Sequence, residues 1–167
     1  MKKAVDEDNI DELKCLINEV GNKNPIIYNH GINPLPLLHY AAWNGKDKSF
    51  QEVSGGLTIK NPPMLSKSDF NRWTPMHFAA SNGHTTIISI IAKMDDVNVN
   101  TKNANGSTPL HLAARISYHL SSVKCLIKLN ADPKIKNNFG ETAYDCAYDC
   151  VVRYNKSECA EYLQQYN

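Results

Sequence analysis

The segment TPMHFAASNGH, residues 74–84, decides the fold because it returns further along the chain. It reappears 34 residues later as TPLHLAARISYH, residues 108–119, and a weaker copy begins after another 34 residues at Thr142. An earlier copy, LPLLHYAAWNGK, places His39 in the slot that His77 holds later. Self-similarity at a fixed period of about 34 residues is typical of a stacked array of short helical hairpins. The sequence therefore predicts an all-α solenoid.

The repeats divide the chain into about five units, which we predict to form a single domain over residues 1–167. The first and last units are expected to be degenerate caps with polar outer ends, because a solenoid must close its core at both ends. Asn, Asp and Gly at the unit boundaries predict short β-hairpin-like finger loops. Gly and Pro pairs after residue 54 predict an irregular loop within the second unit. The predicted unit ranges are 1–30, 31–68, 69–102, 103–136 and 137–167, with the irregular loop at 55–68.

The second helix of each unit is less obvious than the first. The run TTIISIIA, residues 85–92, is rich in β-branched residues and would be a strand by propensity alone. It aligns, however, with residues 124–127 of the next unit, KCLI, which repeat the same letters at 14–17. We therefore predict a helix over 85–92, and we expect Asn130 to end the following helix in a left-handed conformation.

Composition excludes several functional classes. The chain has 18 basic and 17 acidic residues and a formal net charge of +1, which argues against nucleic-acid binding. No apolar run approaches the ~18 residues of a membrane span, and no apolar segment follows the N-terminal lysines as in a secretory signal. Five cysteines without a disulfide-framework spacing favour reduced thiols. We therefore expect a cytoplasmic protein that is monomeric on its own.

These repeated motifs resemble those of the ankyrin-repeat proteins. Their unit reads D-x-x-G-x-T-P-L-H-x-A-A-x-x-G-H, followed by a second helix and a finger loop. Residues 69–84 match best, with Arg72 where the family has Gly, and residues 103–114 match next, with Gly106 in place. The fifth unit has Asp145 in the His slot, and the second has Pro36 in the Thr slot.

The repeated motif residues have physical roles of their own. Threonines 74 and 108 open helices and are able to cap free N–H groups, and a proline follows each of them in the first turn. The motif histidines are expected to bond to neighbouring backbone and to tie adjacent units together. Paired alanines let helices approach closely. These histidines are His39, His77 and His111.

No catalytic or cofactor site is predicted. The motif explains four of the six histidines, counting His84 in its turn, and no nucleophile elbow or Gly-rich phosphate loop is present. Cys146 and Cys150 share a helix face and could hold a metal with Cys159. Cys146, however, occupies the inner apolar slot of the repeat, so a buried hydrophobic role is favoured and no metal is predicted.

The resemblance implies that a partner protein or peptide binds a concave face built from finger tips and first helices. Large apolar side chains fall at several of these normally exposed positions, and both tryptophans are among them, which favours binding. Packing remains the alternative for the aromatic residues of this set. Mapped onto this chain, the predicted partner-binding residues are Trp43, Asn44, Phe70, Asn71, Trp73, Ser81, Asn82, Asn105, Ser107, Arg115, Ile116, Asn138, Phe139 and Glu141.

The function that this resemblance implies is a protein–protein interaction module, acting as an adaptor or a stoichiometric inhibitor, with a microbial or viral effector as one setting. The alternative is a regulatory or assembly subunit that contacts a larger complex through the 55–68 loop. An enzyme is not expected. The resemblance also places Asn98 in the finger-loop slot where ankyrin-type proteins are hydroxylated.

Overall fold

The computed structural model describes residues 3, 6, 7, 9, 11, 27–30, 33–56, 71–94, 97–116, 119–154 and 157–167. Most of the first predicted unit, Phe70 and most of the predicted irregular loop therefore lie outside the described residues. Within the described ranges, no helix is both long enough and apolar enough to cross a bilayer.

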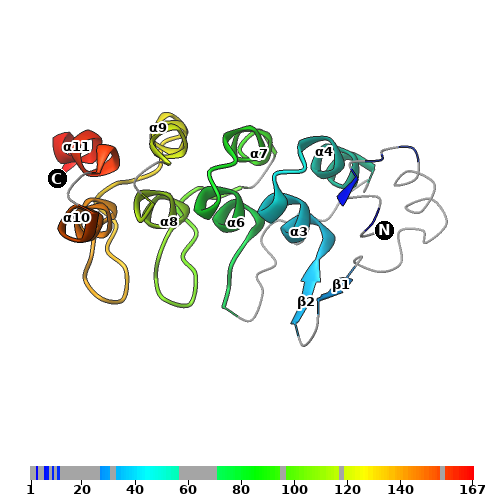
Figure 1. The fold of residues 1–167 in the computed structure, drawn as a ribbon, viewed down its shortest axis with the longest axis horizontal. Coiled ribbons are helices and arrows are strands. Elements are labelled where there is room, and N and C mark those ends of the chain that lie inside the picture. Colours follow the sequence, from blue (N-terminus) through cyan, green and yellow to red (C-terminus); the bar gives the residue numbers. More distant parts are fainter. Residues whose placement is uncertain are drawn as a thin grey trace.

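Two rows of short helices run along the molecule (Figure 1). In each unit the first helix packs against the first helices of the units before and after it, and the second helix covers it from one side. This arrangement confirms the predicted ankyrin-type solenoid. The first row contains α3 (Leu37–Asn44), α6 (Pro75–Ser81), α8 (Pro109–Ala114) and α10 (Ala143–Tyr154); the second contains α4 (Asp47–Gly56), α7 (Thr85–Ile91), α9 (Leu120–Lys128) and α11 (Glu158–Leu163), which runs into the 3-10 turn η2 (Gln164–Tyr166).

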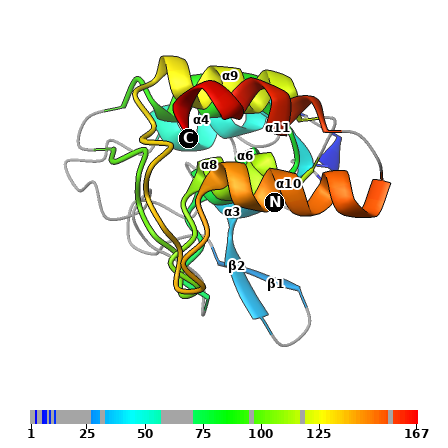
Figure 2. The same cartoon turned by 90° about the vertical axis from the view of Figure 1, so that its left-hand side faces the viewer.

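Finger loops project from one side of the first row and lie over one another in the end-on view of Figure 2. The finger before α3 is an antiparallel hairpin of β1 (Ile27–His30) and β2 (Asn33–Pro36). Later fingers are joined by backbone hydrogen bonds, from Ala104 N–H to the Asn71 carbonyl at 2.8 Å and from Asn138 N–H to the Asn105 carbonyl at 3.0 Å. These bonds hold neighbouring fingers at a fixed spacing.

The hydrophobic core lies between the two rows of helices. First-row helices contribute fully buried alanines and leucines, and the small alanines allow the helices of neighbouring units to approach. Second-row helices contribute larger residues, among them Ile87, Ile88 and Leu126, none of which is exposed. The core is therefore one continuous seam, as the repeat pattern predicts.

The predicted helix over 85–92 is confirmed as α7, although its β-branched residues favour a strand. Asn130 follows α9 with φ of 63°, which confirms the predicted left-handed end. One boundary differs from the prediction. Helix α4 continues through Gly55 and Gly56 and ends at Gly56, so the two glycines form its last turn instead of stopping the helix before them.

The motif histidines tie each unit to the next, as expected. Nε2 of His39 lies 3.1 Å from the Trp73 carbonyl, and His77 makes the same bond at 3.1 Å to Ser107. His111 repeats it at 3.0 Å to Glu141. The three bonds form a ladder that fixes the distance between successive first helices.

Candidate functional site

The predicted partner-binding residues belong to the finger loops and to the ends of the first-row helices, and we call this set the finger face. The finger loops project from one side of the first row (Figures 1 and 2). The described members are Trp43, Asn44, Asn71, Trp73, Ser81, Asn82, Asn105, Ser107, Arg115, Ile116, Asn138, Phe139 and Glu141. Phe70 belongs to the prediction but lies outside the described residues.

Three aromatic residues form a cluster at the junction of the second and third units. The rings of Trp43 and Phe78 are stacked, with centroids 5.8 Å apart and planes inclined by 12°. Trp73 lies against the same phenyl ring at 5.0 Å. Phe78 is buried, Trp73 is half-buried, and Trp43 remains 48% exposed. We call these three residues the aromatic cluster. Phe78 supports both tryptophans, a role that its place in the apolar motif slot did not reveal.

The two tryptophans therefore differ: Trp73 is mainly packed within the fold, whereas Trp43 is largely exposed. Trp73 contacts Phe78 and His77, and its carbonyl accepts the His39 bond, so its position is fixed by the fold. Trp43 leaves about half of its surface open to solvent, and exposed aromatic side chains of this kind are enriched at contact surfaces. Trp43 is therefore the better candidate for a purely binding role.

Two predicted residues have internal roles instead. Ser107 is only 6% exposed, and its backbone bonds to His77 and Asn103, which removes it from the accessible surface. The carboxylate of Glu141 accepts a 2.7 Å hydrogen bond from the Asn137 side chain, within the turn that forms the last finger. Glu141 is half-buried and contributes mainly to the shape of that finger.

Arg72 has an unusual backbone. Its φ is 57°, in the left-handed region, while the equivalent residues of the next two units, Gly106 and Gly140, have φ of 71° and 80°. A non-glycine residue in this conformation costs about 1 kcal/mol. The side chain of Arg72 is exposed and makes no ion pair within the described ranges.

The residue on the following finger differs between these units. A Cβ at Gly106 would collide with the side-chain oxygen and backbone nitrogen of Asn138 on the following finger. One unit earlier the residue in the place of Asn138 is Ala104, which has no such side chain. The side-chain oxygen that approaches Gly106 therefore has no counterpart in the finger that follows Arg72.

Two asparagines of the finger face, Asn44 and Asn82, make the same hydrogen bond with their side-chain amide groups. The Nδ2 groups of Asn44 and Asn82 donate to the carbonyls of Tyr40 and Phe78, four residues earlier, at 2.9 and 3.0 Å. Their Oδ1 atoms accept no hydrogen bond from any described residue. An amide oxygen of this kind is able to accept an N–H group of an extended peptide.

Two other aromatic residues are strongly exposed. Phe139, which the sequence predicts as a binding residue, is 73% exposed at the tip of the last finger. Tyr148 is 51% exposed and was not predicted. It occupies the slot of the second motif alanine, which is buried in each earlier described unit. The sequence signal for Tyr148 is its position six residues after Thr142, where the earlier units have alanine.

The ionisable groups near the face have structural explanations. Burial lowers the pKa of His111. A hydrogen bond from the Thr142 backbone lowers the pKa of Asp145, whose carboxylate takes over the cap that His77 provides in its unit. Burial, with a smaller contribution from Glu141, raises the pKa of the Cys146 thiol to about 12, so this thiol stays protonated. No three His, Cys, Asp or Glu side chains come together in the described ranges, which do not include the Cys150 side chain.

Comparison with known proteins agrees with this geometry. The sequence model of the family described as Ankyrin repeats (3 copies) matches residues 38–137 and 89–167, which together cover most of the chain. The chain belongs to the ankyrin-repeat family. Ankyrin repeats are generally protein–protein interaction modules, so the finger face of this ankyrin-repeat chain is the natural candidate for a binding site.

Individual relatives share the repeats within longer chains. A protein described as an ankyrin repeat protein of Rickettsia bellii is 31% identical over 126 residues, which are 75% of this chain and 45% of that protein. A transient receptor potential cation channel subfamily A member 1 homolog of Caenorhabditis elegans is 30% identical over 54% of this chain and 7% of its own. Alpha-latrotoxin-Lt1a of Latrodectus tredecimguttatus is 35% identical over 44% of this chain and 6% of the toxin. This chain thus spans less than half the length of these relatives.

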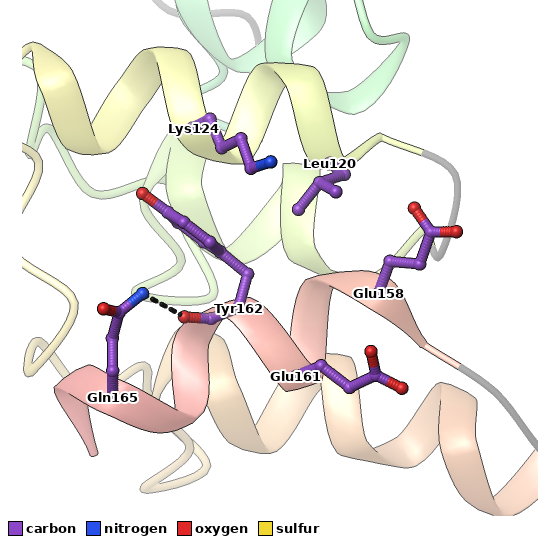
Figure 3. A pocket seen from close by; sticks show the side chains of 6 residues that line it. All are labelled: Leu120, Lys124, Glu158, Glu161, Tyr162 and Gln165. Atoms are coloured by element: carbon purple, nitrogen blue, oxygen red, sulfur yellow. Dashed lines mark hydrogen bonds between the residues drawn. The ribbon is translucent and has the colours of Figure 1, made fainter.

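A second groove lies between the second-row helices α9 and α11 of the ankyrin repeats. Leu120 and Tyr162 form its apolar part, the Lys124 ammonium lies 5.4 Å from the Tyr162 ring centroid, and two glutamates stand at one end (Figure 3). Its volume is about 630 Å³. Both glutamates, Glu158 and Glu161, lie in the first two turns of α11, where carboxylates stabilise the helix dipole. The two glutamates of this groove therefore have a structural explanation, and the exposed Trp43 of the aromatic cluster does not.

Proposed function

We propose that this ankyrin-repeat chain binds a partner protein or peptide on its finger face, and that the aromatic cluster is the centre of the contact. The observation that carries the proposal is the exposure of Trp43, which is stacked on a buried ring and leaves 48% of its surface to solvent. Tryptophan contributes disproportionately to binding energy at protein interfaces. The stack on Phe78 holds the indole in one orientation, so little side-chain entropy is lost on binding.

The proposed role is that of an adaptor or a stoichiometric inhibitor, and the exposed Trp43 on the finger face supports a role in binding. We place the protein in the cytoplasm as a monomer. Cys125 and Cys146 are free thiols, which supports a reducing compartment. A microbial or viral effector acting inside a host cell fits the same features. The alternative contact through the 55–68 loop concerns residues that the structure mostly does not describe.

Replacing Trp43 by Ala tests the proposal. Peptides of twelve residues would be selected from a random display library on the wild-type protein, and their affinities measured by fluorescence polarisation. We expect Trp43→Ala to weaken the selected peptides by more than ~1 kcal/mol, or more than about fivefold, while the melting temperature changes little because the indole is half exposed.

Tyr148→Ala is the matched control, because Tyr148 is an aromatic residue of similar exposure, 51%, in the last unit. It should leave the affinities unchanged. Peptides that bind Trp43→Ala as tightly as the wild type would exclude the aromatic cluster as the binding centre.

A further inference from the structure

Arg72 combines features that an exposed arginine ordinarily lacks. It holds a left-handed backbone with φ of 57°, where the two equivalent residues are glycines. Backbone conformations of this kind persist where the surrounding structure fixes them, and they concentrate at functional sites. Ala104 stands where the next unit has Asn138, so the side-chain oxygen that approaches Gly106 has no counterpart beside Arg72.

The finger that carries Arg72 is also held firmly. The carbonyl of Asn71, the preceding residue, accepts the N–H of Ala104 at 2.8 Å, and the carbonyl of Trp73, the following residue, accepts the His39 bond at 3.1 Å. Arg72 thus sits between two fixed peptide groups and directly precedes a member of the aromatic cluster. The backbone from which its exposed side chain extends is therefore fixed next to the proposed binding centre.

No described carboxylate balances this charge locally. Arg72 makes no ion pair among the described residues. The described finger-face residues of the second, third and fourth units include no Asp or Glu, and Glu141 belongs to the last unit. Among the described residues, the charge of Arg72 beside the aromatic cluster therefore lacks a carboxylate partner and is complementary to an acidic segment.

We propose that Arg72 binds a carboxylate of the partner, and that the partner is a segment in which an Asp or Glu lies beside an apolar side chain. The apolar side chain packs on Trp43 and Trp73. The guanidinium of Arg72 offers the planar pair of N–H donors that a carboxylate accepts in a bidentate manner. The Oδ1 atoms of Asn44 and Asn82 accept N–H groups of the same segment. This inference rests on the proposed function of the finger face and names the chemistry of its partner.

Arg72→Gly separates binding from folding, because it restores the residue of the equivalent units. We expect it to raise the melting temperature by about 2–4 °C, since glycine adopts positive φ without strain. The same variant should weaken the peptides selected on the wild type about fivefold or more at 0.1 M salt. A protein that becomes more stable and binds less well cannot owe its lost affinity to misfolding.

Two further variants isolate the charge. Arg72→Gln keeps the strained backbone and removes the charge, so it should weaken binding as much as Arg72→Gly without the gain in melting temperature. Arg72→Lys keeps the charge and should retain part of the affinity. The peptides selected on the wild type should contain Asp or Glu next to an aromatic or aliphatic residue, and replacing that acid by its amide should abolish the difference between wild type and Arg72→Gln.

The outcomes distinguish this inference from the proposed function. Peptides without acidic residues, bound equally well by wild type and Arg72→Gly but lost with Trp43→Ala, would overturn the role of Arg72 and leave the finger face as the binding site. Peptides that ignore both Arg72 and Trp43 would overturn both. An unchanged or lower melting temperature of Arg72→Gly would contradict the strain on which the inference depends.

Discussion

At the scale of single residues, one small network recurs and explains why the motif uses histidine. The backbone N–H of Thr74 donates to Nδ1 of His77 at 3.1 Å, so this nitrogen must be unprotonated. The proton is therefore on Nε2, which donates to the Ser107 carbonyl of the next unit. Thr108 and His111 repeat this pattern. A neutral imidazole has one acceptor and one donor nitrogen on opposite sides of a rigid ring, so it accepts from its own unit and donates to the next.

This network predicts how stability depends on pH. Burial is the main cause that lowers the pKa of His111 below 6.5, with Lys102 adding to it and Glu141 opposing it. The unfolded chain thus binds a proton at higher pH than the folded chain. The free energy of unfolding should be greatest above pH 6.5 and should fall as the pH drops through the folded-state pKa.

Urea unfolding at pH 7.5 and 5.5 checks this expectation, with His111→Gln as the comparison. The variant should be less stable at pH 7.5, because a buried hydrogen-bonded group is replaced, yet it should lose less stability on acidification. One proton contributes at most about 1.4 kcal/mol per pH unit to the difference. Equal losses in the two proteins would assign the acid sensitivity to other groups.

At the scale of elements, α7 shows that burial outweighs local propensity. Its sequence, TTIISII, contains six β-branched residues among seven, which favour strands. Ile87, Ile88 and Ile91 nevertheless lie on one face and are buried against the first row and the neighbouring helices. The hydrophobic energy of this face stabilises the helix by more than the propensities oppose it.

The balance in α7 is testable with two substitutions, one at a buried and one at an exposed position of the helix. Ile88→Ala should destabilise the protein by about 2–5 kcal/mol, because it leaves a cavity at a fully buried site. Thr86→Ala, at an exposed position, should stabilise it by a few tenths of a kcal/mol, because Ala has the higher helix propensity. Chemical denaturation followed by far-UV circular dichroism measures both. A destabilising effect of Thr86→Ala would mean that this threonine makes a contact of its own.

At the scale of the whole molecule, stability is distributed along the stack. Each described unit contacts its neighbours and few residues further away, so the array behaves as a chain of coupled pieces. Both tryptophans lie in the second and third units, whereas α11 is at the opposite end (Figure 1). Tryptophan fluorescence therefore reports on one half of the molecule, and circular dichroism on all of it.

Weakening the far end should uncouple these two signals. Leu163 is 1% exposed in α11, and Leu163→Ala should destabilise the last unit by about 2–5 kcal/mol. We expect the circular dichroism of this variant to begin changing at lower urea than its tryptophan fluorescence. The wild type serves as the reference for coincidence of the two signals. Coincident transitions in the variant would show that the stack unfolds as a single cooperative unit.

The finger face itself could be predicted only in part. Spacing places Trp43, Trp73 and Phe139 at normally exposed positions, because a fixed period assigns each residue to a slot. It does not distinguish the half-buried Trp73 from the open Trp43, nor does it show Ser107 to be buried. Those differences arise from the side chains of neighbouring units, which the period does not describe.

The repeat period by itself determined the order of the helices, the helical state of residues 85–91, the left-handed Asn130 and the histidine bonds between units, since each follows from one slot pattern copied along the chain. The tertiary structure alone decided that Phe78 supports both tryptophans and that Gly106 lies against Asn138 of the next finger. Both depend on which side chains meet across an interface between units. A repeating pattern specifies the backbone of that interface, whereas its surface chemistry is set by the residues that depart from the pattern.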